Sequence, residues 1–122
     1  MLHEALTNRI LGAAVAVHKA LGPCLTEASY QAAMALEMNA VGLSFEREPT
    51  LEVRYRGIKI GHHRPDFIVE HLVVVELKSA AHLDSVFTTQ VLTYLKLTGL
   101  RVGLLINFNV PVIGYGLKRI VL

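Results

Sequence analysis

One short segment, Leu72–Lys78, constrains the fold more than any other part of the chain. Its centre is the run Val73-Val74-Val75, which is apolar on both faces of an extended strand. Such a strand is typical of the middle of a sheet that is covered on both sides. We therefore expect a sheet with helices packed on its faces, and the 122 residues predict one domain, residues 1–122.

The periodicity of apolar residues predicts the elements around this strand. Spacings of three and four residues predict two helices early in the chain, and a cap at Asp84 or Ser85 predicts a third helix that ends near Thr98. Alternation predicts the strands, including a hairpin that turns at Arg56-Gly57. The expected elements are helices over Leu2–Leu21 and Leu25–Val41, strands over Leu51–Tyr55, around Ile58 and Ile60, and over Pro65–Val69, the central strand, the third helix, and strands over Val102–Asn107 and Leu117–Val121. This order predicts an α/β sandwich whose mixed sheet has an antiparallel β-hairpin core flanked by helices.

The composition narrows the class of protein. Hydrophobic residues make up 52% of the chain and charged residues 18%, so we expect an exposed apolar face that forms a homo-oligomer or binds a partner. The one cysteine, Cys24, excludes an intrachain disulfide and a zinc site of several cysteines, and it fits a reducing cytoplasm. No long apolar run predicts a signal peptide or a membrane span, so we expect no membrane partner. The net charge of +2 is by itself too small to indicate a nucleic-acid partner.

Two charged side chains interrupt the central strand. Glu76 and Lys78 are two residues apart, so they point to the same face of the sheet. A buried charge is costly unless it is paired or binds a metal. Asp66 lies ten residues before Glu76, and it shares their face if the hairpin loop has an odd number of residues and centres on His71. We predict this odd loop, or a bulge with the same effect, because a two-residue loop would pair Asp66 with Val75.

These charges indicate a cation as the ligand. Asp66 and Glu76 contribute a charge of −2 and Lys78 a charge of +1, and neighbouring carboxylates raise each other's pKa unless a cation is present. Oxygen ligands without sulfur suit Mg²⁺ or Mn²⁺. The alternative is structural: Glu76 and Lys78 form a buried ion pair, and Asp66 caps a turn.

The same residues resemble the motif of the PD-(D/E)XK nuclease superfamily, in which Pro65-Asp66 is followed after nine residues by Glu76-Leu77-Lys78. Gln90 and Tyr94 resemble the Q-x-x-x-Y element of the RecB-like nucleases. Nearly the whole chain also resembles a narrower group, the small bacterial proteins of the GxxExxY family. The matching stretches are Gly22–Tyr30, Tyr55–Lys78 and Gln90–Pro111. The resemblance implies a nuclease-like fold, without by itself implying an active enzyme.

The chain departs from the GxxExxY pattern at two positions. Cys24 stands where the motif has Gly, at a cost of about 1 kcal/mol or more if that position needs a positive φ angle. Phe87 stands where many relatives have His, one turn before Gln90. Neither change removes a proposed metal ligand.

The resemblance also implies the roles of the charged residues. Asp66 and Glu76 would hold the metal, and Glu27 in the second helix would be a further ligand to the metal or to water. The alternative for Glu27 is an ordinary solvated helix charge. Lys78 would orient the attacking water or stabilise charge on the scissile phosphate, rather than act as a committed general base.

Gln90 and Tyr94 are four residues apart and share a helical face, so the resemblance implies that they position a phosphate or order the site. Ordinary packing and backbone hydrogen bonding remain the alternative for both. We expect Tyr30 to be a packing residue. His62 and His63 precede the site and are expected to be exposed loop residues, with contact to metal or phosphate as the alternative.

A basic segment precedes the hairpin. Residues 47–64 contain five basic and two acidic residues, and 5 − 2 gives a local net charge of +3. The basic residues are Arg47, Arg54, Arg56, Lys59 and Arg64. A basic rim beside an acidic metal site suits contact with a DNA backbone, and a solvated strand face is the alternative.

These observations leave three hypotheses for function. The first is a nuclease that uses Mg²⁺ or Mn²⁺ to hydrolyse nucleic acid, with DNA favoured over RNA. The second is a catalytically silent nuclease-like module that serves as a nucleic-acid-binding or assembly subunit. The third is an unrelated α/β protein whose ionic groups are structural.

Overall fold

The computed structural model describes all residues, 1–122. Its helices are α1 (Glu4–Leu21), α2 (Glu27–Ala40) and α3 (Ser85–Thr98), and a 3-10 helix, η1, spans Ile113–Gly116. Its strands are β1 (Phe45–Arg47), β2 (Leu51–Tyr55), β3 (Ile58–His63), β4 (Phe67–Val69), β5 (Val73–Lys78), β6 (Val102–Asn107) and β7 (Leu117–Val121).

Side-chain caps fix where the second and third helices begin. The Thr26 hydroxyl accepts a hydrogen bond from Ser29 N (3.2 Å), and the Asp84 carboxylate accepts one from Val86 N (3.0 Å). Gly99 ends α3 in the left-handed conformation, with φ at 73°. None of the helices combines the length and the apolar character that crossing a membrane would require.

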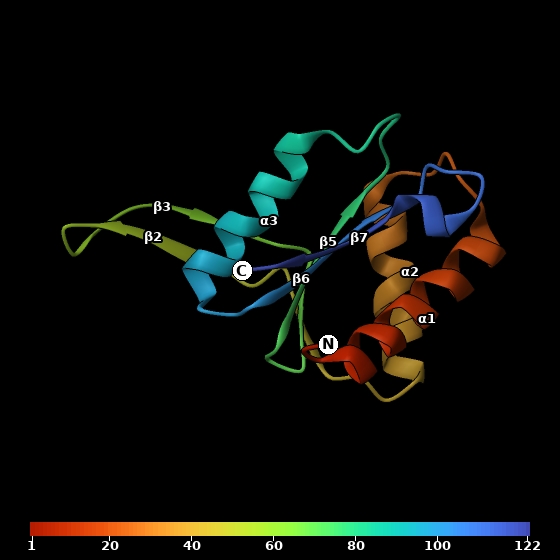
Figure 1. The fold of residues 1–122 in the computed structure, drawn as a ribbon, viewed down its shortest axis with the longest axis horizontal. Helices are drawn as coiled ribbons and strands as arrows, with labels where there is room; N and C mark the ends of the chain where they lie inside the picture. The colour runs from red at the N-terminus through yellow and green to blue at the C-terminus, as the bar shows by residue number, and fades with distance from the viewer.

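Five strands form one mixed sheet in the order β1-β4-β5-β6-β7. β5 and β6 run parallel, and the other neighbouring pairs run antiparallel. Helices α1 and α2 cover one face of the sheet and α3 covers the other (Figure 1). Val73 and Val75 pack in the cluster on the α1–α2 side, and Val74 packs in the cluster on the α3 side. The predicted sandwich, with its covered central strand, is confirmed.

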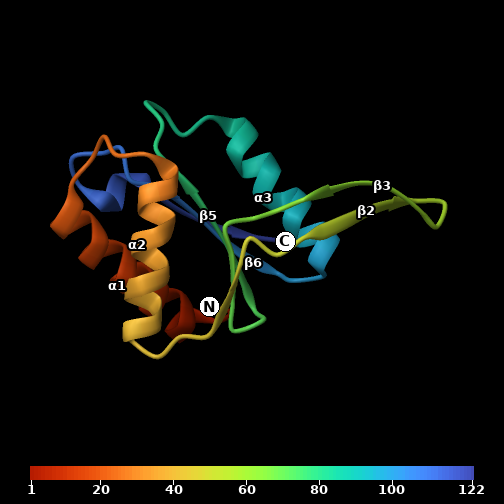
Figure 2. The ribbon, with the colours of Figure 1, turned by 180° about the vertical axis from the view of Figure 1, so that it is seen from behind.

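The β2–β3 hairpin corrects the predicted sheet. These strands pair only with each other and form a separate two-stranded sheet, which projects from the body beside α3 (Figures 1 and 2). The alternation of Leu51, Val53 and Tyr55 predicts a half-buried strand, but Tyr55 is 66% exposed, because only the first part of β2 packs against the α3 side. β1, which the periodicity did not predict, occupies the sheet edge beside β4.

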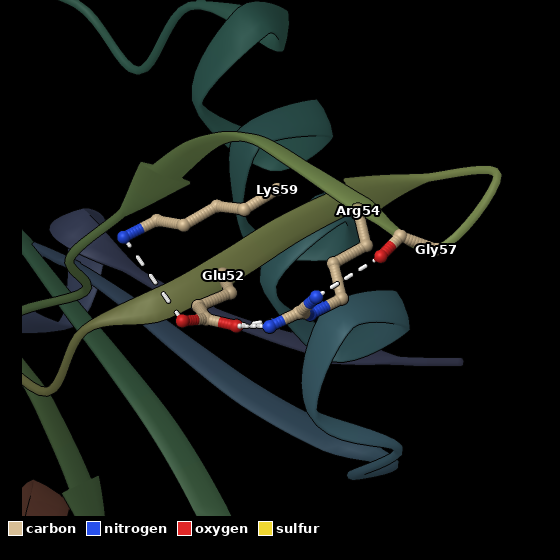
Figure 3. A network of polar contacts seen from close by, with 4 residues as sticks. All are labelled: Glu52, Arg54, Gly57 and Lys59. Atoms are coloured by element: carbon tan, nitrogen blue, oxygen red, sulfur yellow. Dashed lines mark hydrogen bonds and ion pairs between the residues drawn. The ribbon is translucent and has the colours of Figure 1, made fainter.

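A polar network stabilises the projecting hairpin (Figure 3). Arg54 donates to Glu52 Oε2 from Nε (3.0 Å) and Nη2 (2.8 Å), and to the Gly57 carbonyl from Nη1 (3.1 Å). Lys59 Nζ lies 4.0 Å from Glu52 Oε1. Such exposed ion pairs contribute at most about 1 kcal/mol each. Their main consequence here is that Glu52 offsets part of the positive charge of Arg54 and Lys59.

Cys24 has a φ angle of 74°, in the left-handed region. Glycine adopts this conformation freely, whereas the Cβ of cysteine makes it strained. We therefore expect Cys24→Gly to raise the free energy of unfolding by about 1 kcal/mol, measured by urea unfolding. Cys24→Ala keeps the Cβ and is the matched control, with no gain expected. An equal gain in both variants would show that the thiol, and not the backbone, is the source of the cost.

Candidate metal centre

The β4–β5 hairpin places Asp66 opposite Glu76. β4 pairs with residues 73–75 in antiparallel register, so the loop comprises residues 70–72 and centres on His71. The next pair outward, directly beyond the ladder, is Asp66 with Glu76. The predicted odd loop is confirmed. Glu76 shares the face of Val74, which α3 covers, and Asp66 lies opposite it just before β4.

Both carboxylate oxygens of Asp66 accept a hydrogen bond. Leu77 N donates to Oδ2 (2.7 Å), and Gln31 Nε2 donates to Oδ1 (2.7 Å). The Asp66 backbone N in turn donates to Oε1 of Glu76 (3.1 Å). The acceptor for the Asp66 N–H is therefore the Glu76 carboxylate and not a backbone carbonyl of β5. β4 accordingly begins at Phe67 instead of at the predicted Pro65.

Glu76 is a buried acid beside a second acid. Only 6% of its surface is exposed, and its Oε2 lies 3.5 Å from Lys78 Nζ. Burial, and then the charge and hydrogen bonding of Asp66, raise the pKa of Glu76 to about 8, while Lys78 opposes this shift. The close contact between Glu76 and Lys78 that the structural alternative requires is thus present. Asp66, however, does more than cap a turn, because its carboxylate also joins α2 to the hairpin.

The Lys78 ammonium contacts both a carboxylate and an aromatic ring. Its Nζ lies near the Glu76 carboxylate and also 4.7 Å from the centroid of the Phe87 ring. A cation over an aromatic face is attracted by the ring, and more so when the pair is shielded from water. Only 13% of the lysine side chain is exposed. Phe87, one of the two departures from the GxxExxY pattern, therefore contacts the central lysine of the site directly.

Gln90 and Tyr94 on α3 lie in the same pocket lining as Lys78. Tyr94 is 3% exposed, and burial, followed by the charges of Glu76 and Asp66, raises the pKa of its phenol to about 12, opposed by a hydrogen bond with Gln90. The phenol is therefore protonated at any physiological pH. Both side chains line a pocket of about 420 Å³. His63, Lys78, Phe87 and Thr93 are also in its lining.

A comparison with known protein families matches residues 4–120 to the PD-(D/E)XK nuclease superfamily. The chain belongs to this superfamily. Neither the curated proteins nor the solved structures with which it was compared gave a match. Membership excludes the unrelated α/β protein as a hypothesis, and the narrower resemblance to the GxxExxY family stays a prediction.

PD-(D/E)XK nucleases generally use divalent metal ions, and the residues present fit such an ion. Asp66 and Glu76 offer only oxygen ligands, and a cation would offset the burial and the repulsion from Asp66 that raise the pKa of Glu76. Two protein carboxylates also suit Mg²⁺, which usually keeps several waters. No group of three or more His, Cys, Asp or Glu side chains lies close enough together to hold a metal, so a site here would depend on this pair.

Glu27 borders the site without joining the pair. It is the exposed first residue of α2, one turn before Gln31 and on the same helical face. Gln31 reaches Asp66, and Ser79, just after β5, donates to the Leu25 carbonyl (2.6 Å). The N-terminus of α2 therefore lies against the end of the strand that carries Glu76 and Lys78. The role of Glu27 as a ligand stays a prediction.

Two residues that orient the superfamily motif were missed from the sequence. Arg47 Nε donates to Gln31 Oε1 (2.8 Å), which turns the amide nitrogen of Gln31 toward Asp66. A signal for Gln31 exists, because it interrupts the buried side of α2 that carries Met34 and Met38. No comparable signal exists for Arg47, because it lies in β1, a strand that the periodicity does not predict.

The structure also shows where Tyr30, His62 and His63 lie. Tyr30 is fully buried and stacks on Phe108, with ring centroids 4.4 Å apart, so its predicted packing role is confirmed. His62 and His63 are exposed as predicted, but both lie in β3 and not in a loop. His63 lines the pocket, with its ring centroid 6.1 Å from that of Tyr94.

Proposed function

We propose that the protein is a metal-dependent nuclease that hydrolyses phosphodiester bonds in nucleic acid, with DNA favoured over RNA. The observation that carries the proposal is the facing pair of carboxylates, Asp66 and Glu76, with Lys78 beside it. Membership of the PD-(D/E)XK nuclease superfamily supports the class of reaction.

Asp66 and Glu76 would hold Mg²⁺ or Mn²⁺, and Glu27 would contribute from the edge of the site. When bound, the ion would polarise a phosphoryl oxygen and lower the pKa of a water. The hydrogen bonds from Gln31 and Leu77 N fix the Asp66 carboxylate in advance. Such supporting contacts orient a ligand and raise its affinity for metal.

Lys78 and Tyr94 would act on the phosphate. Glu76 and Phe87 position the Lys78 ammonium, so its charge is available to stabilise negative charge that develops during hydrolysis or to orient the attacking water. Tyr94, with its pKa of about 12, keeps its proton and can donate a hydrogen bond. Gln90, one turn before Tyr94 on α3, lies beside the phenol and would help to orient it.

The cations of the basic segment are not equally available to a nucleic acid. Arg47 is engaged with Gln31, and Glu52 neutralises part of the hairpin charge (Figure 3). Arg56 and Arg64 are exposed and form no ion pair. These two arginines are therefore the best candidates for contact with the phosphate backbone, which supports nucleic acid as the substrate.

The test compares the wild type with Lys78→Met, which keeps an unbranched side chain against Phe87. We expect the wild type to cleave DNA with Mg²⁺ or Mn²⁺ and not with EDTA. The variant is expected to bind Mn²⁺ but to cleave about 100-fold more slowly, because the lysine stabilises the reaction and not the ion. Calorimetry and cleavage of labelled DNA and RNA are measured on the same samples. Lys96→Met, at an exposed position on α3, is the matched control.

Mn²⁺ binding by the wild type without cleavage of any substrate would favour the silent nuclease-like module. Absence of Mn²⁺ binding would contradict the proposal and make the charged cluster structural. Equal cleavage by wild type and Lys78→Met would remove Lys78 from the mechanism.

A further inference from the structure

The pocket beside the candidate metal centre extends beyond the charged cluster. Its volume of about 420 Å³ falls within the range of about 300–1,000 Å³ in which proteins bind small organic groups. Lys78 lines the pocket, whereas Asp66 and Glu76 do not. Most of the lining comes from one face of α3 between Val86 and Tyr94. The pocket therefore has room for a part of the substrate other than the phosphate that meets the metal.

The lining has the chemistry of a site for a flat, polar-edged ring. Val86 and Phe87 supply apolar and aromatic surface, and the Gln90 amide can both donate and accept hydrogen bonds. The hydroxyls of Thr89 and Thr93 donate to the carbonyls of Ser85 and Thr89, so they remain available as acceptors. No carboxylate lines the pocket. A negatively charged backbone beside it would therefore meet no repulsion from the walls.

We propose that this pocket binds the nucleobase of the nucleotide next to the scissile phosphate, and that the substrate is single-stranded or unpaired at that nucleotide. The inference rests on the proposed nuclease function, since that function places a phosphate beside Lys78. A base has a flat face that packs on an aromatic side chain and an edge that hydrogen-bonds amides and hydroxyls. Phe87, Gln90 and the two threonines of the lining match these two needs.

Phe87 links the base to the site of hydrolysis. Its ring lines the pocket and also lies 4.7 Å from Lys78 Nζ. A base packed against Phe87 therefore has its own phosphate close to the lysine that faces Glu76. His63 on β3 also lines the pocket, and its ring lies near Tyr94. The pocket would thus position the phosphate as well as bind the base.

A paired substrate does not satisfy this geometry. Inside a duplex the base is stacked and paired, and its removal from the stack costs free energy that a single strand does not spend. A concave pocket on the α3 face also cannot reach a base that stays within a helix. The pocket therefore favours a single-stranded or unpaired substrate over a duplex, in DNA and in RNA alike.

The test measures binding and cleavage separately. The probe is a labelled single-stranded DNA of about 20 nucleotides, which exceeds the site size of a single-strand binding groove. Fluorescence anisotropy with Ca²⁺ measures the binding of this strand and of the same sequence as a duplex. Cleavage is measured with Mn²⁺. We expect the single strand to bind about 10-fold more tightly than the duplex. Phe87→Ala is expected to weaken single-strand binding about 10-fold, since a stacked base contributes about this much, and so to reduce the preference for the single strand over the duplex. Tyr115→Ala removes an aromatic residue that is 76% exposed on η1 and outside the lining, and is the control.

A second measurement uses only the wild-type protein, so it does not depend on the folding of a variant. The single strand carries one abasic nucleotide, moved stepwise along the sequence, and cleavage next to the abasic position is expected to fall about 10-fold. Equal binding of both forms, or cleavage indifferent to the abasic nucleotide, would overturn the proposal. Duplex binding that is tighter than single-strand binding and depends on Arg56 would also overturn it, and would indicate that the β2–β3 hairpin binds the nucleic acid. Single-strand binding that needs Phe87, without cleavage in any metal, would support the pocket while it contradicts the nuclease.

Discussion

Asp66→Asn is expected to abolish Mn²⁺ binding and to slow cleavage by about 1,000-fold or more, because the metal is expected to supply several kcal/mol of transition-state stabilisation. The change removes one of the two facing carboxylates and half of their negative charge. Glu76 alone, beside Lys78, offers an ion one acidic ligand and a nearby positive charge. Calorimetric titration with Mn²⁺ and a cleavage assay on the same preparation measure the two losses.

The same variant should remain folded. The substituted amide would retain one acceptor oxygen, whereas Asp66 accepts from both Gln31 and Leu77 N. One donor therefore loses its partner, at a cost of about 1–3 kcal/mol. Asp84→Asn is the matched control, because asparagine caps a helix as well as aspartate does. Mn²⁺ affinity unchanged in Asp66→Asn would show that the ion binds elsewhere and would remove the main support for the proposed mechanism.

The sequence alone predicts that Asp66 and Glu76 face each other, because both residues lie in one hairpin. Strand side chains alternate with a period of two, so the choice of an odd loop after Val69 determined that Asp66 faces Glu76. The run Val73-Val74-Val75 likewise identified the covered strand at the centre of the sheet. Both conclusions depend on residues within one hairpin, where chain geometry leaves few alternatives.

Contacts between distant segments could not be predicted in the same way. Gln31 and Asp66 are 35 residues apart in sequence, and nothing in either segment specifies that α2 passes the end of β5. The alternation in Leu51–Tyr55 is the same for a strand inside the main sheet and for a separate hairpin, so the pattern did not show that β2 and β3 project into solvent. Phe87 was noted as a departure from a family pattern, but its contact with Lys78 required the placement of α3 over the sheet.

Glu76→Gln is expected to make the metal-free protein more stable than the wild type at alkaline pH, by a few kcal/mol at roughly 1.4 kcal/mol per unit of pKa shift. The pKa of Glu76 is about 8 in the folded protein and 4.5 ordinarily, so the folded state binds the proton more tightly than the unfolded chain. This contribution to the free energy of unfolding is fully present below about pH 4.5 and is lost as the pH rises through about 8. Glutamine is neutral throughout, so the two proteins should be similar near pH 5 and diverge toward about pH 9.

With Mn²⁺ present, the wild type should be more stable than Glu76→Gln at alkaline pH. At alkaline pH the ion binds the ionised wild-type pair and stabilises the folded state by mass action, while Glu76→Gln lacks the second carboxylate, gains no stability and loses cleavage. Thermal unfolding by circular dichroism, at both pH values with EDTA or Mn²⁺, measures these differences. Glu52→Gln changes an acid whose side chain is 45% exposed and should alter stability by less than about 1 kcal/mol at either pH. A stability difference between Glu76→Gln and wild type that did not change with pH would mean that Glu76 is already ionised at neutral pH, and its burial beside Asp66 would then give no reason to expect a cation.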